Sequence, residues 1–590
     1  MTAARPRGSR RRAHDVGVAA DQAASEPPHR QLQKSHTNFA KGVSVRLSLR
    51  SSLTLFIAAA TVATVAAGAP TPAGARIGTQ ESAVAEAGGA APIWGECPPV
   101  ESGIPRDPRQ QCATLRMPLD YRAPRGRSVE IAISRIGTAQ PGSRRGILLS
   151  NPGGPGDSGL DLISQLAVVL PREVLDQYDL IGFDPRGVGH STPVTCGLDP
   201  VKQFTLRLPY PAPDGDIERN IAFARDTAAA CAEHSGDLLP FITTANTARD
   251  MDRIRAALGE PKLSYFGISY GTYLGAVYIS MFPGRTDRIV LDSAVDPDLV
   301  WRDMLRTWSE AVAVRLPDLL AFAAERDAVY HLGTTPDEVR RTFNRLIAAL
   351  DRQPVPVPGG PVIDGNALRE ITRRGLYFDG YFPLIAGVWQ ELVAGTSGST
   401  VDAAVLTRLD RLGSAGRAGG GDTGTAEIPA DNSTAALYAV ICDDVAWPRS
   451  VALHARQVAA DRRAWPVTAG MPSNLWPCAA WPTRPVEPPV TVTGTGPRNV
   501  LILQNTRDPS TSLANARGLR AALGRRAAMI TVDQGGHGVF GLGSCADEAM
   551  SSFLATGALP GRDRFCPAPS PADAVARSTP LPYIPPAGPL

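Results

Sequence analysis

Short apolar segments alternate with amphipathic segments in two separate parts of the chain. Each apolar segment is only five or six residues long, which is typical of parallel strands that are buried on both faces. Strands that alternate with helices predict a mostly parallel, doubly wound α/β sheet. We expect a discontinuous core, formed by residues 94–295 and 495–570. The strand-like segments are residues 146–150, 179–184, 263–268, 288–292, 499–503 and 528–532.

Helical periodicity dominates between the two parts of this core. Residues 301–326, 335–351 and 368–394 each carry apolar positions at helical spacing. A Gly/Ala/Thr-rich stretch at residues 413–425 interrupts the pattern and is expected to form a loop. We therefore predict that residues 296–494 form a helical cap inserted into the α/β core.

The N-terminal segment has the composition of an export signal. Residues 1–75 contain ten lysines and arginines but three carboxylates, and an apolar run at residues 53–67 follows the last basic residue. Small-residue sites follow this run, and we expect cleavage after Ala75. The alternative is an uncleaved signal anchor, which would be the chain's sole link to a membrane. Because the basic excess belongs to this leader, we expect no nucleic-acid partner.

The segments that flank the core are low in periodicity. Residues 76–93 are rich in Ala and Gly and are expected to form a linker. The tail, residues 571–590, is rich in proline and is expected to be extended.

All eight cysteines follow the leader, which agrees with export to an oxidising compartment. No pair forms a C-x-x-C motif, so structural disulfides are favoured over a metal site, and free buried thiols are the alternative. Eight cysteines allow 105 pairings, but their clustering along the chain suggests that neighbours pair. The expected disulfides are Cys97–Cys112, Cys196–Cys231, Cys442–Cys478 and Cys545–Cys566.

A serine stands between two glycines where the strand at residues 263–268 turns into a helix. The segment Gly267-Ile268-Ser269-Tyr270-Gly271 matches the G-x-S-x-G nucleophile elbow. The turn is so tight that small neighbours are needed, and it raises the serine hydroxyl to the carboxyl edge of the sheet. Ser269 is therefore the candidate nucleophile.

A nucleophilic serine needs a base and an acid that orients the base. His537 follows the strand at residues 528–532 in a glycine-rich loop, and Asp508 follows the strand at residues 499–503. Asp292 and Asp296 are the alternatives for the acid. The order Ser269, Asp508, His537 is that of the α/β-hydrolase fold, which is our predicted fold class. Such a site needs no metal and no cofactor.

The oxyanion formed during acyl transfer needs backbone N–H donors. One donor is expected from Tyr270, next after the nucleophile. The other is expected from Gly153 or Gly154, because glycine lets the backbone approach a substrate closely. Asp184 and Arg186, which follow another strand, are expected to brace the site as an ion pair.

Four motifs in order resemble the secreted tripeptidyl aminopeptidases of actinobacteria. They are residues 151–156 (Asn-Pro-Gly-Gly-Pro-Gly), 184–191, 267–272, and the late pair Asp508 and His537. The resemblance covers roughly residues 94–570. It implies an α/β-hydrolase serine peptidase that acts at a free peptide N-terminus beneath a helical cap. Prolyl aminopeptidases have histidine at the position of Pro152, so proline specificity is not implied, and some relatives act mainly as esterases.

An exopeptidase must recognise a free ammonium group, and a carboxylate in the cap is the simplest partner. Asp443 and Asp444 are the candidates, followed by Glu391, and solvated surface acids are the alternative. Aromatic residues of the cap could line a side-chain pocket or form the cap core. These aromatic residues are Tyr377, Phe378, Tyr381, Phe382 and Trp389.

Taken together, the sequence predicts an exported, extracellular serine hydrolase that removes short peptides from free N-termini through an acyl-enzyme. One alternative is a carboxylesterase with the same three catalytic residues. The other is a non-catalytic surface-binding protein with a relic site. The expected partner is a peptide or ester substrate.

Overall fold

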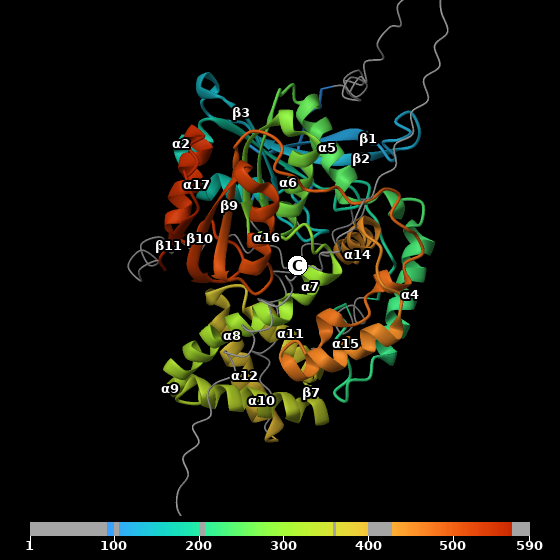
Figure 1. Cartoon of the computed structure of the whole chain (residues 1–590), viewed down its shortest axis with the longest axis vertical. Coiled ribbons are helices and arrows are strands. Elements are labelled where there is room, and N and C mark those ends of the chain that lie inside the picture. Colours follow the sequence, from blue (N-terminus) through green and yellow to red (C-terminus); the bar gives the residue numbers. More distant parts are fainter. Residues whose placement is uncertain (1–90, 100–104, 200–206, 358–361, 399–427, 569–590) are drawn as a thin grey trace, which may run out of the picture. The chain divides into compact units, whose positions relative to one another are not determined.

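The computed structural model describes residues 91–99, 105–199, 207–357, 362–398 and 428–568 (Figure 1). The leader and its cleavage site, the loop predicted at residues 413–425 and the tail at residues 571–590 lie outside these ranges, as does nearly all of the predicted linker. No helix in the described ranges is long and apolar enough to cross a membrane.

A nine-stranded sheet forms the centre of the described chain, in the order β1-β2-β4-β3-β5-β6-β9-β10-β11. The first three strands in this order pair antiparallel, and every later neighbour pairs parallel. The sheet is therefore mostly parallel, as predicted. The strands are β1 (Gln111–Pro118), β2 (Ser128–Ile136), β3 (Gly146–Asn151), β4 (Tyr178–Phe183), β5 (Leu263–Ile268), β6 (Thr286–Asp292), β9 (Val500–Arg507), β10 (Ala527–Gly535) and β11 (Arg564–Cys566).

Helices cover both faces of this sheet. Alternate residues of the same strand belong to different hydrophobic clusters: Leu149 packs in the cluster that contains α5 and α6, and Leu148 packs in the cluster that contains α1 and α17. Burial on both faces explains why these strands are apolar throughout and not alternating. The covering helices are α1 (Leu162–Val169), α2 (Arg172–Leu175), α5 (Thr244–Ala257), α6 (Tyr270–Met281), α16 (Leu513–Leu523) and α17 (Cys545–Thr556).

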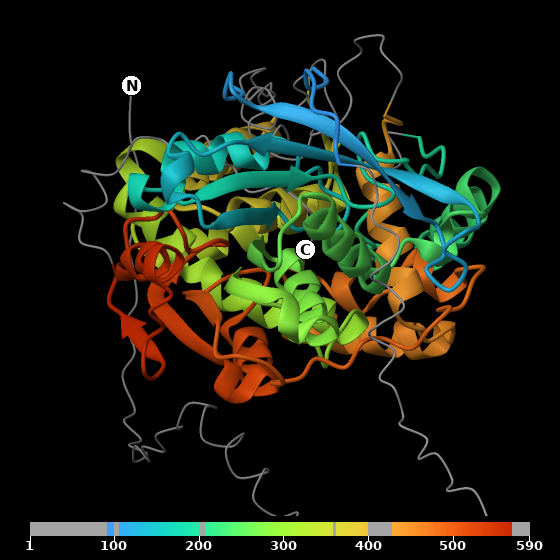
Figure 2. The same ribbon diagram turned by 90° about the horizontal axis from the view of Figure 1, so that it is seen from above.

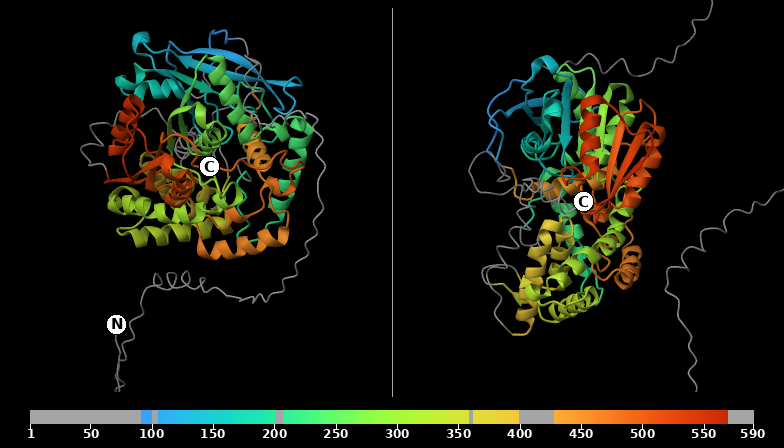
Figure 3. Two further views of the ribbon diagram at one scale, coloured as in Figure 1. Left: turned by 45° about the horizontal axis from the view of Figure 1, so that its top comes forward. Right: turned by 90° about the vertical axis from the view of Figure 1, so that its left-hand side faces the viewer.

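The described part of the segment between β6 and β9 is mainly helical and contains a two-stranded ribbon of β7 (Val355–Pro356) and β8 (Val362–Ile363). Helices α8, α10, α11 and α12 pack around a hydrophobic cluster of their own. Figures 1 and 3 show these helices gathered below the carboxyl edge of the sheet. The helices are α7 (Arg302–Arg306), α8 (Trp308–Glu325), α9 (Asp327–Tyr330), α10 (Pro336–Arg352), α11 (Gly365–Gly375), α12 (Phe382–Thr396), α14 (Asn432–Asp444) and α15 (Val451–Ala464).

Two of the helices predicted in this segment are broken. The stretch predicted at residues 301–326 divides at Thr307 into α7 and α8, and the stretch predicted at residues 368–394 divides into α11 and α12. The second break occupies residues 376–381, where Leu376 and Tyr377 turn toward the core. Hydrophobic periodicity continued into the second break because Leu376 and Tyr377 are buried although they lie outside a helix.

Four disulfides join sequence neighbours: Cys97–Cys112, Cys196–Cys231, Cys442–Cys478 and Cys545–Cys566. The first joins the entry segment to β1, and the second joins Cys196 to helix α4 (Glu218–Ser235). The third joins α14 to the 3-10 turn at Pro477–Ala480, and the fourth joins α17 to β11. Figure 2 shows the chain from above, with β1 and β2 along one edge of the sheet and the helices α16 and α17 at the other.

Candidate active site

Ser269 occupies the tight turn between β5 and α6. Its φ of 57° lies in the left-handed region, which a residue other than glycine rarely adopts. The Ser269 N–H donates to the Asp292 carbonyl at 2.9 Å, and the Thr272 hydroxyl donates to the Ser269 carbonyl at 2.6 Å. A Cβ on Gly267 would lie 2.4 Å from the Gly271 carbonyl oxygen, so the crossing of the chain requires glycine there.

Asp508 and His537 meet at the carboxyl ends of β9 and β10. The His537 Nδ1 lies 2.9 Å from Asp508 Oδ2 and 3.0 Å from Oδ1. Asp508 also accepts the N–H groups of Ser510 and Thr511 at 2.8 and 2.9 Å, so its orientation is determined by the backbone. Within the described ranges His537 Nε2 is buried without a hydrogen-bond partner, which leaves this nitrogen able to exchange a proton with a nucleophile.

Asp292, an alternative acid, has a different position. Its backbone carbonyl holds Ser269, while its carboxylate accepts the N–H groups of Val539 and Phe540, both at 2.9 Å. Asp292 thus connects the nucleophile turn to the loop that carries His537. Burial raises the pKa of this carboxyl group to about 6, although these N–H donors oppose the shift. The sequence analysis did not predict that Asp292 bridges these two segments. The available signal was that Asp292 ends β6, at the same edge of the sheet as Ser269 and His537.

Asp296, the other alternative acid, packs against α16 and not against His537. Its carboxylate packs against Gly518 of α16, where a Cβ would come within 1.9 Å of the Asp296 Oδ2. Asp508 is therefore the acid that the structure brings to His537.

The glycine loop after β3 packs directly on the nucleophile turn. A Cβ on Gly153 would lie 2.6 Å from the Ile268 carbonyl oxygen and 3.0 Å from Ser269 Cβ. The Gly153 N–H donates to Asn151 Oδ1 at 3.0 Å. Because that N–H is engaged, we retain Gly154 and Tyr270 as the candidate oxyanion donors and give Gly153 the role of close packing. Tyr270 is the first residue of α6, where N–H groups lack intrahelical acceptors.

The predicted ion pair between Asp184 and Arg186 is wrong. Arg186 forms a bidentate pair with Asp250, with both distances 2.7 Å, in a fully buried environment. Asp184 accepts the Ser158 hydroxyl at 2.6 Å and the His190 N–H at 2.8 Å. Each of the two charges therefore has partners other than the one predicted, Asp250 for Arg186 and Ser158 for Asp184.

The break between α11 and α12 brings the cap onto His537. The Tyr377 carbonyl accepts the His537 N–H at 2.9 Å, and the two rings meet edge to face at 5.2 Å. The Tyr377 hydroxyl accepts a hydrogen bond from Arg373 at 3.1 Å. Trp389 stacks on Phe343 inside the cap. The predicted aromatic set is therefore divided: Tyr377 lies at the site, and Trp389 belongs to the cap core.

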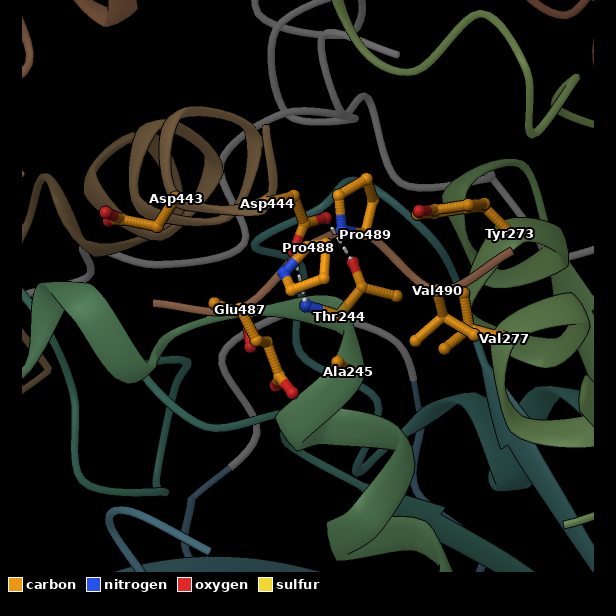
Figure 4. Close-up of a pocket in the computed structure, with 11 residues that line it drawn as sticks. Thr244, Ala245, Tyr273, Val277, Asp443, Asp444, Glu487, Pro488, Pro489 and Val490 are labelled. Atoms are coloured by element: carbon orange, nitrogen blue, oxygen red, sulfur yellow. Dashed lines mark hydrogen bonds between the residues drawn. The ribbon is translucent and has the colours of Figure 1, made fainter. Parts of the chain in front are cut away.

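Asp443 and Asp444 lie at the end of α14, beside a pocket lined by α5, α6 and residues 487–490 (Figure 4). Trp481 and Thr483 donate to Asp443, whereas Thr244 and Trp301 donate to Asp444. Both carboxylates are buried, so the alternative of solvated surface acids is wrong, and their binding of a substrate ammonium stays a prediction. Burial raises the pKa of Asp443 to about 7 and that of Asp444 to about 6. Glu391 lies in α12, which packs on α8, α10 and α11.

Sequence reasoning also passed over Asp157 in the glycine loop and Arg207. Asp157 follows the motif at residues 151–156 directly, and this adjacency was the available signal. No local motif marks Arg207, whose charge acts on the Asp157 carboxylate.

The fold and the nucleophile turn define a serine hydrolase of the α/β-hydrolase class. Residues 146–370 match the family profile described as "alpha/beta hydrolase fold", and residues 467–566 match the profile described as "TAP-like protein". The chain is 37% identical over 469 residues to the tripeptidyl aminopeptidase of Streptomyces coelicolor, an alignment that covers 77% of this chain and 83% of the relative. The chain belongs to the tripeptidyl aminopeptidase family, which confirms the resemblance stated from the motifs.

Two mycobacterial relatives carry other names. The serine protease Hip1 of Mycobacterium tuberculosis is 30% identical over 479 residues, covering 77% of this chain and 87% of the relative. The carboxylesterase B of the same species is 31% identical over 495 residues, covering 80% and 89%. The family is enzymatic, and the chain is a serine peptidase or hydrolase of the aminopeptidase type.

Proposed function

We propose that this protein releases short peptides from the free N-termini of polypeptides, with Ser269, His537 and Asp508 as the catalytic residues. The observation that supports this most directly is the hydrogen-bonded Asp508–His537 pair, whose second imidazole nitrogen has no hydrogen-bond partner in the described ranges. The similarity to proteins named tripeptidyl aminopeptidase and serine protease supports a peptide as the substrate.

The reaction would proceed through an acyl-enzyme. Ser269 Oγ attacks the scissile carbonyl carbon while His537 Nε2 accepts the hydroxyl proton. The oxyanion is stabilised by the N–H groups of Tyr270 and Gly154. His537 then protonates the leaving amine, and a water molecule, deprotonated by the same nitrogen, releases the peptide from Ser269. Asp508 holds the imidazole with Nδ1 protonated and stabilises its positive charge.

Digestion of a defined peptide library with mass-spectrometric readout tests the specificity. Products of three residues from unblocked peptides, and no products from N-acetylated copies, are the expected result. Cleavage inside the acetylated peptides would contradict the proposal. Ser269→Ala should abolish all product formation, and this variant controls for contaminating peptidases.

A carboxylesterase is the second candidate, because one relative carries that name. A comparison of peptidyl-arylamide and acyl-ester turnover separates the two functions. Much faster ester turnover, with both activities lost in Ser269→Ala, would favour the esterase. A relic site that only binds would leave Ser269 unlabelled by a fluorophosphonate probe.

We further propose that the protein acts outside the cytoplasm. Four disulfides in one chain support this, because such bonds persist in oxidising compartments. Detection of the protein in culture supernatant, with its N-terminus following Ala75, is the expected result. Retention of the full leader on membranes would indicate a signal anchor.

A further inference from the structure

Asp157 is a buried carboxylate with an unused acceptor in the loop that packs on Ser269. The residue is 8% exposed, and its Oδ1 accepts one long hydrogen bond, 3.3 Å from Ser433 Oγ. Its Oδ2 is buried and has no hydrogen-bond partner among the residues that the structure describes. A buried, unsatisfied carboxylate oxygen is rare in folded proteins and requires an explanation.

Arg207, a cation that interacts electrostatically with Asp157, also has an unsatisfied buried atom. The Nη2 of Arg207 is also buried without a hydrogen-bond partner in the described ranges. The charges of Arg207 and Asp157 influence each other: the guanidinium partly offsets the rise in the pKa of Asp157, which burial raises to about 6. Burial, aided by the charge of Arg374, lowers the pKa of Arg207 to about 10. Two opposite charges thus lie close enough to interact and yet form no direct hydrogen bond.

The position of Asp157 connects the nucleophile to the helix α14. Gly153 packs on Ser269, and a Cβ on Gly154 would lie 3.2 Å from Asp157 Oδ2. On the other side, a Cβ on Gly156 would lie 2.4 Å from the Ser433 carbonyl oxygen. Asp157 is therefore near the reacting serine but separated from it by the two glycines of the oxyanion loop.

A buried charge without a partner opposes folding, because it has lost its hydration and gained little in return. A ligand that carries the opposite charge would supply the missing partner. A peptide N-terminus matches both orphan groups, since its ammonium is a hydrogen-bond donor and its first carbonyl is an acceptor. An extended acyl group of three residues spans roughly 10 Å, so its ammonium would lie near Ser269 without touching it.

We propose that Asp157 binds the α-ammonium of the substrate and that Arg207 Nη2 donates a hydrogen bond to the carbonyl of the substrate's first residue. The two residues form the subsite that restricts the enzyme to free N-termini. This inference rests on the proposed peptidase function, and it assigns the recognition of the ammonium to the core loop and not to Asp443, Asp444 or Glu391 of the cap segment.

The test compares Asp157→Asn with the wild type on three substrates. These are a tripeptidyl arylamide with a free N-terminus, its N-acetylated copy and a short acyl ester. Loss of one charge-assisted hydrogen bond should lower kcat/KM for the free peptide about 10- to 100-fold. Ester turnover and fluorophosphonate labelling of Ser269 should stay within about twofold of the wild type. Arg207→Gln should lower kcat/KM for the free peptide and spare the ester.

Asp161→Asn is the matched control, because it makes the same change four residues further along. The Asp161 carboxylate is already paired with Arg106 at 2.7 Å, so its replacement should not alter the preference for the free peptide over the acetylated peptide. Thermal unfolding separates recognition from structural support. Asp157→Asn should keep a cooperative unfolding transition, because the asparagine oxygen can still accept the hydrogen bond from Ser433 Oγ.

Two results would overturn the inference. One is an Asp157→Asn variant that retains the wild-type preference for free over acetylated peptides. The other is a variant that loses ester and peptide turnover in parallel and melts at a lower temperature, which would make Asp157 a structural support. If the wild type itself cleaved free and acetylated peptides equally, the proposed exopeptidase function would fail as well, so the two failures are distinguishable.

Discussion

The backbone carbonyl of Tyr377 accepts the N–H of His537 at 2.9 Å, so a residue of the helical segment between β6 and β9 directly holds the loop of the candidate base. The Tyr377 ring also meets the imidazole edge to face. Arg315 of α8 supports the same turn by donating to the Leu376 carbonyl at 3.1 Å. Displacement of these helices would therefore move His537 relative to Ser269.

Removal of the Tyr377 ring should reduce catalysis more than removal of its hydroxyl. We expect Tyr377→Ala to lower kcat/KM about 10- to 100-fold, because small displacements of a catalytic group are costly. Tyr377→Phe keeps the ring and loses one hydrogen bond from Arg373, so its loss should stay within about fivefold. Steady-state kinetics on a tripeptidyl arylamide measure both effects.

Tyr330→Ala is the control for this pair, because Tyr330 contacts Phe322 in the same helical segment. Equal losses in the Tyr330 and Tyr377 alanine variants would indicate general destabilisation of the helices. Equal losses in Tyr377→Phe and Tyr377→Ala would assign the effect to the hydroxyl and not to the ring.

Asp292→Asn should weaken the connection between the nucleophile turn and the histidine loop. The two carboxylate oxygens accept the N–H groups of Val539 and Phe540. In asparagine one of these oxygens becomes an NH₂ group, which is a donor and cannot accept either N–H. We expect a loss of about 1–3 kcal/mol in the free energy of unfolding and a lower rate of Ser269 labelling by a fluorophosphonate. Asp287→Asn, at the opposite end of β6, is the control. Labelling at the wild-type rate in Asp292→Asn would exclude the bridging role.

Asp508→Asn should leave the fold intact and remove most of the activity. The amide cannot accept the Nδ1 proton of His537 in the same way as a carboxylate, so the imidazole loses its favoured tautomer. We expect kcat to fall about 10³- to 10⁴-fold, as in other serine triads, with an unchanged circular dichroism spectrum. Asp533→Asn, which affects a surface pair with Arg507, controls for charge. A loss below tenfold in Asp508→Asn would point to another acid.

Asp443→Asn should stabilise the protein in a pH-dependent manner. Burial raises the pKa of Asp443 from 3.8 to about 7, so the folded state binds a proton that the unfolded state has released. Ionisation of Asp443 therefore lowers the free energy of unfolding. The loss is absent below pH 3.8 and complete above about pH 7, where it amounts to at most roughly 4 kcal/mol.

The asparagine can keep both contacts, because its oxygen accepts the Trp481 indole N–H and its amide donates to the Thr483 hydroxyl. We therefore expect the variant to melt above the wild type at pH 8, with a smaller difference at pH 5. A lower melting temperature at pH 8 would mean that the ionised form is stabilised by contacts stronger than its burial penalty.

Local pattern in the sequence was sufficient to predict the alternation of strands and helices, the turn at Ser269 and the proximity of Asp508 to His537. Burial on both faces makes a strand apolar, and a nucleophile turn demands small residues, so both leave a mark within a few positions. The carboxyl ends of parallel strands share one edge, so residues that follow β9 and β10 were expected to meet.

Only the tertiary structure showed which groups the buried charged side chains bind. Arg186 pairs with Asp250, and the Asp292 carboxylate accepts the N–H groups of residues 539 and 540. Partners on separate elements depend on how side chains pack, which periodicity does not encode. For the same reason the buried bonds of Asp443 and Asp444, and the unsatisfied oxygen of Asp157, became visible only when the elements were assembled.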